Sequence, residues 1–342
     1  MTHGGDIYRN IVEYDFSVNI NPLGTPESVN ENLKDNVTDV ACYPDYESEE
    51  LRKLLSDYYC LNIDSILCGN GASELFMAVV HALNPKKAIV PVPSFYGYKY
   101  VLTSAGTEII YYQMKEYNGF RLDEGIIDFL DREKDIDMLF LANPNNPVGN
   151  LVDSGLMDKL LDKCKEKNIF VILDECFMNL SSNPDSTKSG ELDKWDNLCI
   201  IRAFTKTFAM PALRLGYLIG NNKDFLKKIK AHLPEWNVSL LAQRAGVAAL
   251  NSGNYICRAR TVIDNERIYL TNCINDMGFM VYPSDANFIM IKTDKPIYDI
   301  LLKRGILIRD CSDFEGLKKG FYRIAVKTHR ENELLVNCLK DI

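Results

Sequence analysis

The sequence predicts an α/β fold in which helices and strands are layered into a largely parallel sheet, followed by a second, smaller α+β domain. Between about residues 64 and 230, short apolar or β-branched runs alternate with amphipathic segments, which is typical of such layers. After Gly278 the apolar runs become shorter and are separated by helical segments. At 342 residues the chain exceeds the roughly 250–300 residues at which single cores stop growing, so it has room for two domains.

The individual elements follow from hydrophobic spacing. Apolar side chains recur at helical spacing over residues 74–83 and 153–167. The polar stretch 181–194, with its Asn-Pro and Ser-Gly pairs, is expected to be a loop. Residues 237–276 are expected to form one long helical stretch that joins the domains, with further helices at 297–303 and 331–339. Strands are expected at residues 65–68, 88–91, 108–113, 138–142, 170–173, 198–203, 215–219, 279–282, 287–291 and 322–326.

Composition excludes several classes of function. With 39 Lys+Arg against 47 Asp+Glu the net charge is -8, which argues against nucleic acid as the main partner. The longest apolar runs fall far short of the ~18 residues that span a bilayer, and the start has no signal-peptide pattern, so we expect no membrane partner and a cytoplasmic location. Ten scattered cysteines and four histidines predict reduced thiols and no metal site.

A Gly-rich turn from Gly69 to Glu74 follows a strand and opens a helix. Free backbone N–H groups and the helix dipole suit a phosphate at such a turn, although an ordinary strand-to-helix turn explains the same residues. The run Gly-Asn-Gly-Ala-Ser-Glu departs from the Gly-x-Gly-x-x-Gly of dinucleotide sites and from the P-loop pattern. A single phosphate is therefore the candidate ligand.

Four charged residues lie in or directly after apolar strands. Asp174 ends the strand 169–173, where it is either a helix-capping acid or the partner of a protonated ring nitrogen. Lys206 follows the strand 198–204; it is either a solvated side chain or, with a pKa lowered by apolar neighbours, an amine able to form a Schiff base. Arg309 and Arg323 each need an anion, and two arginines in one small domain favour a dianionic ligand over structural salt bridges.

The order of these motifs is more specific than any one of them. The Gly-rich turn is followed by Asn-Asn-Pro-Val-Gly at 145–149, Asp174-Glu175, Thr205-Lys206, Arg214 eight residues later, and the two C-terminal arginines. This order resembles the fold-type I pyridoxal-phosphate enzymes of the class I/II aminotransferase family, in particular the branch with histidinol-phosphate aminotransferase and threonine-phosphate decarboxylase. The resemblance implies a three-layer αβα cofactor domain over residues 40–240 and a small domain made of residues 1–39 and 241–342.

The resemblance also implies a role for each matching residue. Lys206 would bind pyridoxal 5'-phosphate covalently and move protons, Asp174 would pair with the ring nitrogen, and Asn146 would donate to the ring's phenolic oxygen. Either Phe95 or Tyr96 would stack on the ring. The cofactor phosphate would be held by Gly71, Ala72, Ser73, Thr205 and Arg214. The substrate would be bound by His3, Gly4, Gly5, Asn19, Arg309 and Arg323.

Two further positions bear on assembly and on the reaction. In this branch the residue matching Tyr43 reaches the cofactor site of the neighbouring subunit, which implies a homodimer. Where the aminotransferase has Asp-Glu-Ala-Tyr, with its tyrosine bonded to the phenolic oxygen, this chain has Phe177, which cannot make that bond. Phenylalanine here, the His-Gly-Gly-Asp opening at 3–6 and the proline within 206–214 are more typical of the decarboxylase.

The leading interpretation is therefore a lyase that decarboxylates a small O-phosphorylated amino acid, such as L-threonine O-3-phosphate, in cobamide biosynthesis. The alternatives are a transaminase of the histidinol-phosphate type, a serine-phosphate decarboxylase, and a non-catalytic module that binds a phosphate ligand. The last of these has no need of Lys206 opposite Asp174. Which arginine, Arg309 or Arg323, binds the carboxylate and which the phosphate stays open.

Overall fold

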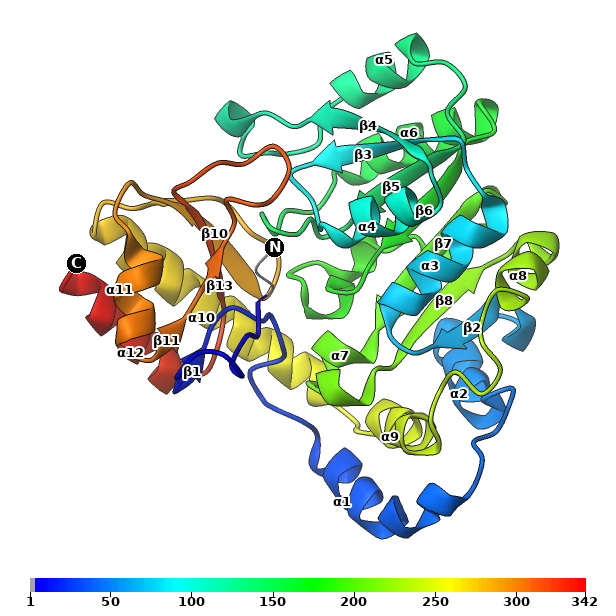
Figure 1. The fold of residues 1–342 in the computed structure, drawn as a ribbon, viewed down its shortest axis with the longest axis horizontal. Coiled ribbons are helices and arrows are strands. Elements are labelled where there is room, and N and C mark those ends of the chain that lie inside the picture. The colour runs from blue at the N-terminus through cyan, green and yellow to red at the C-terminus, as the bar shows by residue number, and fades with distance from the viewer. Residues whose placement is uncertain (1–3) are drawn as a thin grey trace.

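A seven-stranded sheet forms the centre of the larger part of the molecule, in the order β2-β8-β7-β6-β5-β3-β4 (Figure 1). The computed structural model describes residues 4–342. Strands β3 to β7 pair in parallel, whereas β8 runs antiparallel to both of its neighbours, β7 and β2. The largely parallel sheet is therefore confirmed. Its strands are β2 (Ile66–Gly69), β3 (Lys87–Val92), β4 (Glu108–Gln113), β5 (Met138–Ala142), β6 (Phe170–Asp174), β7 (Leu198–Ala203) and β8 (Gly216–Gly220).

Helices cover both faces of this sheet because its strands are apolar on both sides. Along β5, Phe140 faces one apolar core, while Leu139 and Leu141 face the other. The first core includes residues of α3 (Ala72–Leu83), α4 (Gly97–Ser104) and α8 (Lys223–Lys230). The second includes residues of α2 (Glu49–Tyr59), α5 (Gly125–Arg132), α6 (Ser154–Glu166) and α9 (Leu240–Leu250). The three-layer αβα arrangement is thus confirmed.

The smaller part is built on a four-stranded antiparallel sheet of order β12-β13-β10-β9. Next to it, β1 from the start of the chain pairs in parallel with β11. Apolar side chains of α10, α11 and α12 pack on these strands, and Phe16 lies in the same core. The elements are β1 (Tyr14–Asp15), β9 (Met280–Val281), β10 (Phe288–Lys292), β11 (Ile306–Leu307), β12 (Arg309–Asp310), β13 (Phe321–Ala325), α10 (Tyr255–Asp276), α11 (Ile297–Lys303) and α12 (His329–Lys340).

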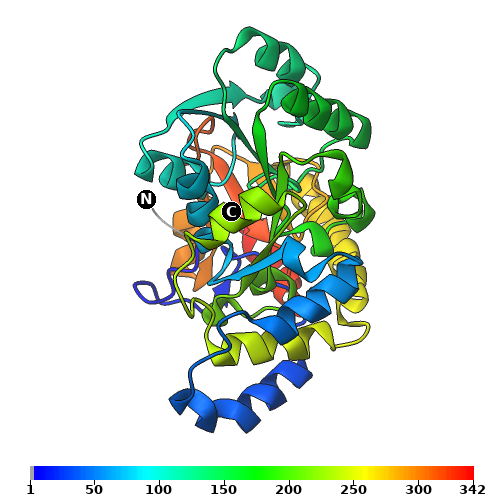
Figure 2. The ribbon, with the colours of Figure 1, turned by 90° about the vertical axis from the view of Figure 1, so that its right-hand side faces the viewer.

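Helix α1 (Glu27–Asn36) packs against α9, and α9 packs against α2, at one end of the molecule (Figure 2). Val29 of α1 lies in the core beneath the seven-stranded sheet. The division of the chain at residues 39 and 241 stays a prediction; α1 and α9, which it assigns to the small domain, pack on the side of the large sheet.

The expectation of one long helix over residues 237–276 is wrong. The segment Asn251–Asn254 separates α9 from α10, and Gly253 within it has a φ of +62°. Asn, Ser and Gly leave helical geometry readily, and Gly tolerates this positive φ without strain. The polar stretch 181–194 is irregular apart from two 3-10 turns, Pro184–Ser186 and Ser189–Lys194. Among residues 4–342, no helix combines the length and the apolar character needed to cross a bilayer.

Candidate active site

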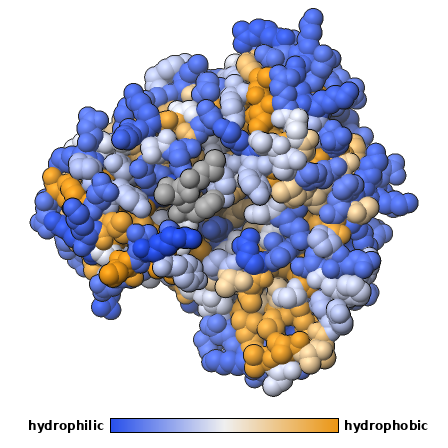
Figure 3. Space-filling model, viewed as in Figure 1, coloured by the Kyte–Doolittle hydropathy of each residue, from blue (hydrophilic) through white to orange (hydrophobic). Residues whose placement is uncertain are grey.

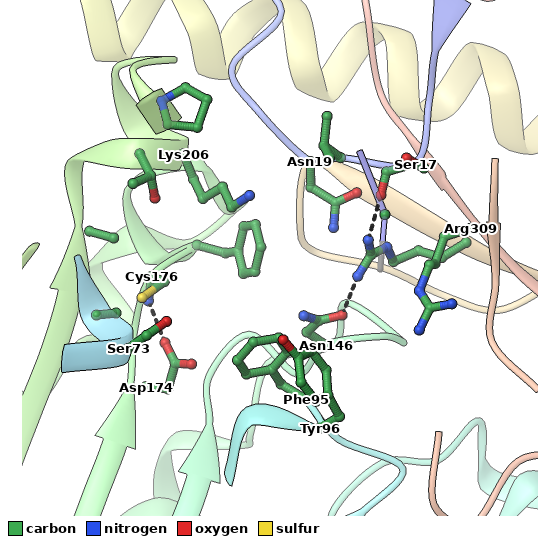
Figure 4. A pocket seen from close by; sticks show the side chains of 18 of the residues that line it. Ser17, Asn19, Ser73, Phe95, Tyr96, Asn146, Asp174, Cys176, Lys206 and Arg309 are labelled. Carbon is green, nitrogen blue, oxygen red and sulfur yellow. Dashed lines mark hydrogen bonds between the residues drawn. The ribbon is translucent and has the colours of Figure 1, made fainter. Parts of the chain in front are cut away.

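A pocket of about 370 Å³ lies at the carboxyl ends of the parallel strands, where they meet the smaller part of the molecule (Figure 4). Loops that follow β3, β5, β6 and β7 form one side of it, and the segment 17–19 with β12 and β13 forms the other. This is the usual location of a ligand site in an open α/β sheet. The residues expected from the sequence that line the pocket are Gly4, Asn19, Ala72, Ser73, Phe95, Tyr96, Asn146, Asp174, Phe177, Thr205, Lys206, Arg214, Arg309 and Arg323.

Lys206 extends from the short helix α7 (Phe204–Thr207), directly after β7, into the middle of this pocket (Figure 4). The segment near residue 20 fixes its backbone, because the Asn21 N–H donates to the Lys206 carbonyl at 3.1 Å. Burial, together with the positive charges of Arg323 and Arg214, lowers the pKa of Lys206 to about 8. Within residues 4–342, its amine has no hydrogen-bond or ion-pair partner. A partly deprotonated amine that faces a cavity is a good nucleophile.

Asp174 ends β6 with its carboxylate on the pocket wall. Its Oδ2 accepts a hydrogen bond from the Tyr98 hydroxyl at 2.6 Å, and its Oδ1 accepts one from the Cys176 backbone N–H at 2.9 Å. Burial raises the pKa of Asp174, and these hydrogen bonds oppose the rise. Since Asp174 forms no ion pair within residues 4–342, a cationic group in the pocket would complete its electrostatic environment.

The start of α3 and Arg214 together form a corner that suits an anion. Gly71 precedes the helix with a φ of +78°, and a Cβ added there would lie 2.6 Å from Arg214 Nη2. A Cβ on Gly216 would likewise lie 2.8 Å from the Ala72 nitrogen. The two glycines therefore allow the guanidinium and β8 to approach the free N–H groups of the helix terminus, which attract a phosphate.

Two arginines lie at the opposite end of the pocket. Arg323 is buried; it donates to Asn146 Oδ1 at 2.5 Å and to the Ser17 carbonyl at 2.7 Å. Its Nε has no hydrogen-bond partner among residues 4–342. The Asn146 amide is thereby oriented with its nitrogen toward the pocket (Figure 4). Arg309 pairs with Asp313 at 2.7 Å. Burial lowers the pKa of Arg323 to about 10, so it stays a cation at neutral pH.

A few expected residues lie elsewhere. Gly71 packs behind Arg214, and the Gly5 N–H donates to Ser17 Oγ at 2.7 Å without lining the pocket. Tyr43 is 81% exposed outside the pocket, with its ring 5.2 Å from that of Trp236. His3 lies outside the described residues.

The sequence alone assigned no role to several residues that line or support the site, namely Ser17, Val18, Phe76, Tyr98, Cys176, Ala203, Pro211 and Phe314. Most of these residues lie within a few positions in sequence of residues that were predicted to belong to the site. This closeness in sequence is the one signal that could have indicated them.

Comparisons with known proteins identify the family. The family model for aminotransferase class I and II matches residues 12–339. The threonine-phosphate decarboxylase of Salmonella typhimurium is 33% identical, covering 96% of this chain and 90% of that protein. The adenosylcobalamin biosynthesis bifunctional protein of Leptospira interrogans is 34% identical to this chain. The alignment covers 96% of this chain and 38% of the Leptospira protein. Among solved structures, the histidinol-phosphate aminotransferase from Clostridium acetobutylicum is 35% identical with a TM-score of 0.89, covering 96% of this chain and 98% of that one. The chain therefore belongs to the class I and II aminotransferase family and is a pyridoxal-phosphate-dependent enzyme of fold type I.

Proposed function

We propose that the protein decarboxylates an O-phosphorylated amino acid, L-threonine O-3-phosphate first among them, in cobamide biosynthesis. The observation that carries the choice of reaction is Phe177, which lines the pocket and offers no hydroxyl. The names of two relatives, a threonine-phosphate decarboxylase and an adenosylcobalamin biosynthesis protein, support the same reading. The second candidate is a transaminase of the histidinol-phosphate type, supported by the solved structure with 35% identity.

The pocket fits pyridoxal phosphate at several points. The unpaired Lys206 amine suits covalent attachment, the buried Asp174 carboxylate suits a protonated ring nitrogen, and the corner of α3 with Arg214 suits the phosphate. Asn19 also lines this pocket, and neither polar atom of its buried side chain has a hydrogen-bond partner in the described part of the chain. We assign Phe95 rather than Tyr96 to the ring face, because Phe95 packs on Tyr98 beside Asp174, whereas Tyr96 interacts with Arg309.

The bound cofactor supplies an electron sink for the electron pair released when a bond at the substrate Cα breaks. Arg309 and Arg323 would bind the substrate phosphate and carboxylate and so orient the bonds at Cα. Asn146, whose Oδ1 accepts a hydrogen bond from Arg323, would donate its Nδ2 hydrogen to the phenolic oxygen. The protonated Lys206 amine would deliver the proton that replaces the departing carbon dioxide at Cα. Asp174 would hold a proton on the ring nitrogen.

Phe177 distinguishes the two candidate reactions at this site. Its ring packs edge-on against Phe288, with centroids 5.1 Å apart, and it is 8% exposed. A tyrosine in its place would offer a hydroxyl to the cofactor's phenolic oxygen, as the aminotransferase pattern implies. Without that hydroxyl, Asn146 would bind the phenolic oxygen with less help.

We further propose that the enzyme is a cytoplasmic homodimer. Tyr43 and Trp236 form an exposed aromatic cluster with Tyr46, whose ring lies 6.0 Å from that of Trp236. Val37 and Val40 are also exposed at this end of the molecule, where an apolar patch is visible (Figure 3). A second copy would cover this surface and receive Tyr43 near its cofactor site. All ten cysteines are free thiols, which supports a reducing compartment.

One assay tests the proposed reaction. The purified protein with pyridoxal phosphate is incubated with threonine phosphate, and separately with histidinol phosphate and 2-oxoglutarate, while carbon dioxide and glutamate are followed. We expect carbon dioxide from threonine phosphate and no glutamate. Glutamate formation without carbon dioxide would overturn the decarboxylase proposal in favour of the transaminase. A parallel reaction with serine phosphate ranks the two phosphorylated substrates.

A further inference from the structure

Tyr98 lies behind the pocket wall and joins two of its residues. It is fully buried on α4, and its hydroxyl donates to Asp174 Oδ2 at 2.6 Å. Its ring stacks on Phe140 with centroids 5.0 Å apart, and it meets Phe76 and Phe95 edge-on at 5.5 and 5.6 Å. One side chain therefore contacts both the carboxylate proposed for the ring nitrogen and the aromatic ring proposed for the ring face.

We propose that Tyr98 is a positioning residue that fixes the orientation and the negative charge of Asp174, so that Asp174 can keep the cofactor ring nitrogen protonated. The inference rests on the proposed binding of pyridoxal phosphate at this site. It holds for a decarboxylase and for a transaminase alike, because both reactions draw electrons toward that nitrogen.

The orientation of Asp174 follows from the two hydrogen bonds it accepts. Tyr98 holds Oδ2, and the Cys176 backbone N–H holds Oδ1, so the carboxylate plane cannot turn without losing one of them. The three aromatic contacts of Tyr98 in turn fix its ring. A hydrogen bond to a buried charge changes an equilibrium by roughly 10- to 100-fold, which is enough to affect cofactor binding measurably.

The charge of Asp174 depends on the same contact. Burial alone raises the pKa of this carboxyl group, and the hydrogen bonds from Cys176 and Tyr98 oppose that rise. Burial, with the neighbouring Asp174 charge, also raises the pKa of Tyr98 well above its ordinary value, so the phenol remains a neutral donor. The titratable groups that act on the charge of Asp174 are Tyr98 from α4, and Glu175 and Cys176, which directly follow β6. The negative charge of Glu175 raises the pKa of Asp174, whereas the hydrogen bonds from Tyr98 and Cys176 lower it and so favour the charged carboxylate.

The test is the substitution Tyr98→Phe, which keeps the ring and removes the hydroxyl. The matched control is Tyr112→Phe, because the Tyr112 hydroxyl donates to an aspartate, Asp123, at 2.7 Å and neither residue lines the pocket. Pyridoxal-phosphate affinity is measured by absorbance titration of the apoprotein, and the absorbance of the bound cofactor is followed against pH. We expect Tyr98→Phe to weaken cofactor affinity roughly 10- to 100-fold, to shift the pH titration and to lower kcat more than it raises KM. Tyr112→Phe should change none of these.

A double-mutant cycle with Asp174→Asn separates this role from simple packing. If Tyr98 acts through the carboxylate, Tyr98→Phe should change cofactor affinity by less than about 3-fold in the Asp174→Asn background. Circular dichroism verifies that each variant is folded. Wild-type affinity in Tyr98→Phe, or an equal loss in both backgrounds, would overturn the inference. The wild-type protein reports separately on the proposed function. If the wild-type protein binds pyridoxal phosphate but releases no carbon dioxide, the proposed decarboxylation is refuted, and the variants still decide the role of Tyr98. If the wild-type protein binds no pyridoxal phosphate, both proposals are refuted.

Discussion

Substitution of Gly71 by alanine should separate cofactor binding from folding. Gly71 has a φ of +78° and a ψ of 168°, a backbone region essentially restricted to glycine, so a side chain there costs about 1–3 kcal/mol of folding free energy. The new Cβ would lie 2.6 Å from Arg214 Nη2, whereas ordinary contact begins at 3.4 Å, so the flexible guanidinium has to move by roughly 1 Å. Loss of its charge-assisted hydrogen bond to a phosphate is worth about 1.5–3 kcal/mol, which lowers pyridoxal-phosphate affinity roughly 10- to 100-fold.

Gly106→Ala is the matched control. Gly106 also has a positive φ, of +72°, and among the described residues a Cβ there meets no atom within 4 Å, so alanine at this position is strained without crowding a neighbour. Urea unfolding of the two apoprotein variants measures how much folding stability each substitution costs. Absorbance titration with pyridoxal phosphate should show a loss of affinity in Gly71→Ala alone. Equal cofactor affinity in the two variants would refute the assignment of the phosphate to the corner formed by α3 and Arg214.

The remaining predictions concern Lys206, a buried ion pair between Arg202 of β7 and Glu175, and Arg309 at the substrate end of the pocket. Because the pKa of Lys206 is about 8, its amine is about one-tenth neutral at pH 7 and nine-tenths neutral at pH 9, so coupling of the apoprotein to pyridoxal phosphate should accelerate as pH rises through 8. Stopped-flow absorbance gives the pH midpoint of the coupling rate, and a midpoint near pH 10 would contradict the lowered pKa of Lys206. Arg202→Met leaves Glu175 buried without its cation and should lower the free energy of unfolding, measured in urea, by about 3–5 kcal/mol. Adding Glu175→Gln should restore part of this loss of stability. An undiminished loss in the double variant would argue against the ion pair as its cause. Arg309→Gln should raise KM for threonine phosphate by about 100-fold and leave cofactor affinity unchanged. Weakened cofactor binding would contradict the assignment of Arg309 to the substrate.

Much of the fold and the chemistry of the pocket follow from local sequence patterns. Apolar runs mark the strands because both faces of a parallel sheet are buried, and polar residues at the carboxyl ends of those runs mark the pocket. Asp174 and Lys206 are predictable in this way, since each directly follows such a run. The break at Asn251–Asn254 also has a local signal, which the apolar spacing on both sides outweighed.

The support behind the pocket has no local signal. Tyr98 stands in a run of tyrosines with Tyr96 and Tyr100, and its partner Asp174 is 76 positions away. Only the packing of α4 on the sheet brings the hydroxyl to the carboxylate. The pairing of Arg309 with Asp313 likewise depends on the loop after β12. Such contacts join elements far apart in sequence or across irregular loops, where no periodicity fixes the geometry.

The segment 17–21 links the two ends of the pocket and therefore bears on the choice of reaction. At one end, the Asn21 backbone N–H donates to the Lys206 carbonyl and its side chain donates to the Thr207 carbonyl at 2.9 Å. At the other end, the Ser17 carbonyl accepts from Arg323. Under the proposed function, the position of Arg323 relative to Lys206 would select which bond at the substrate Cα breaks. Lys206 would serve a decarboxylase and a transaminase equally. We therefore expect the difference between the two reactions to reside in this segment and in Phe177, and not in the residues that bind the cofactor.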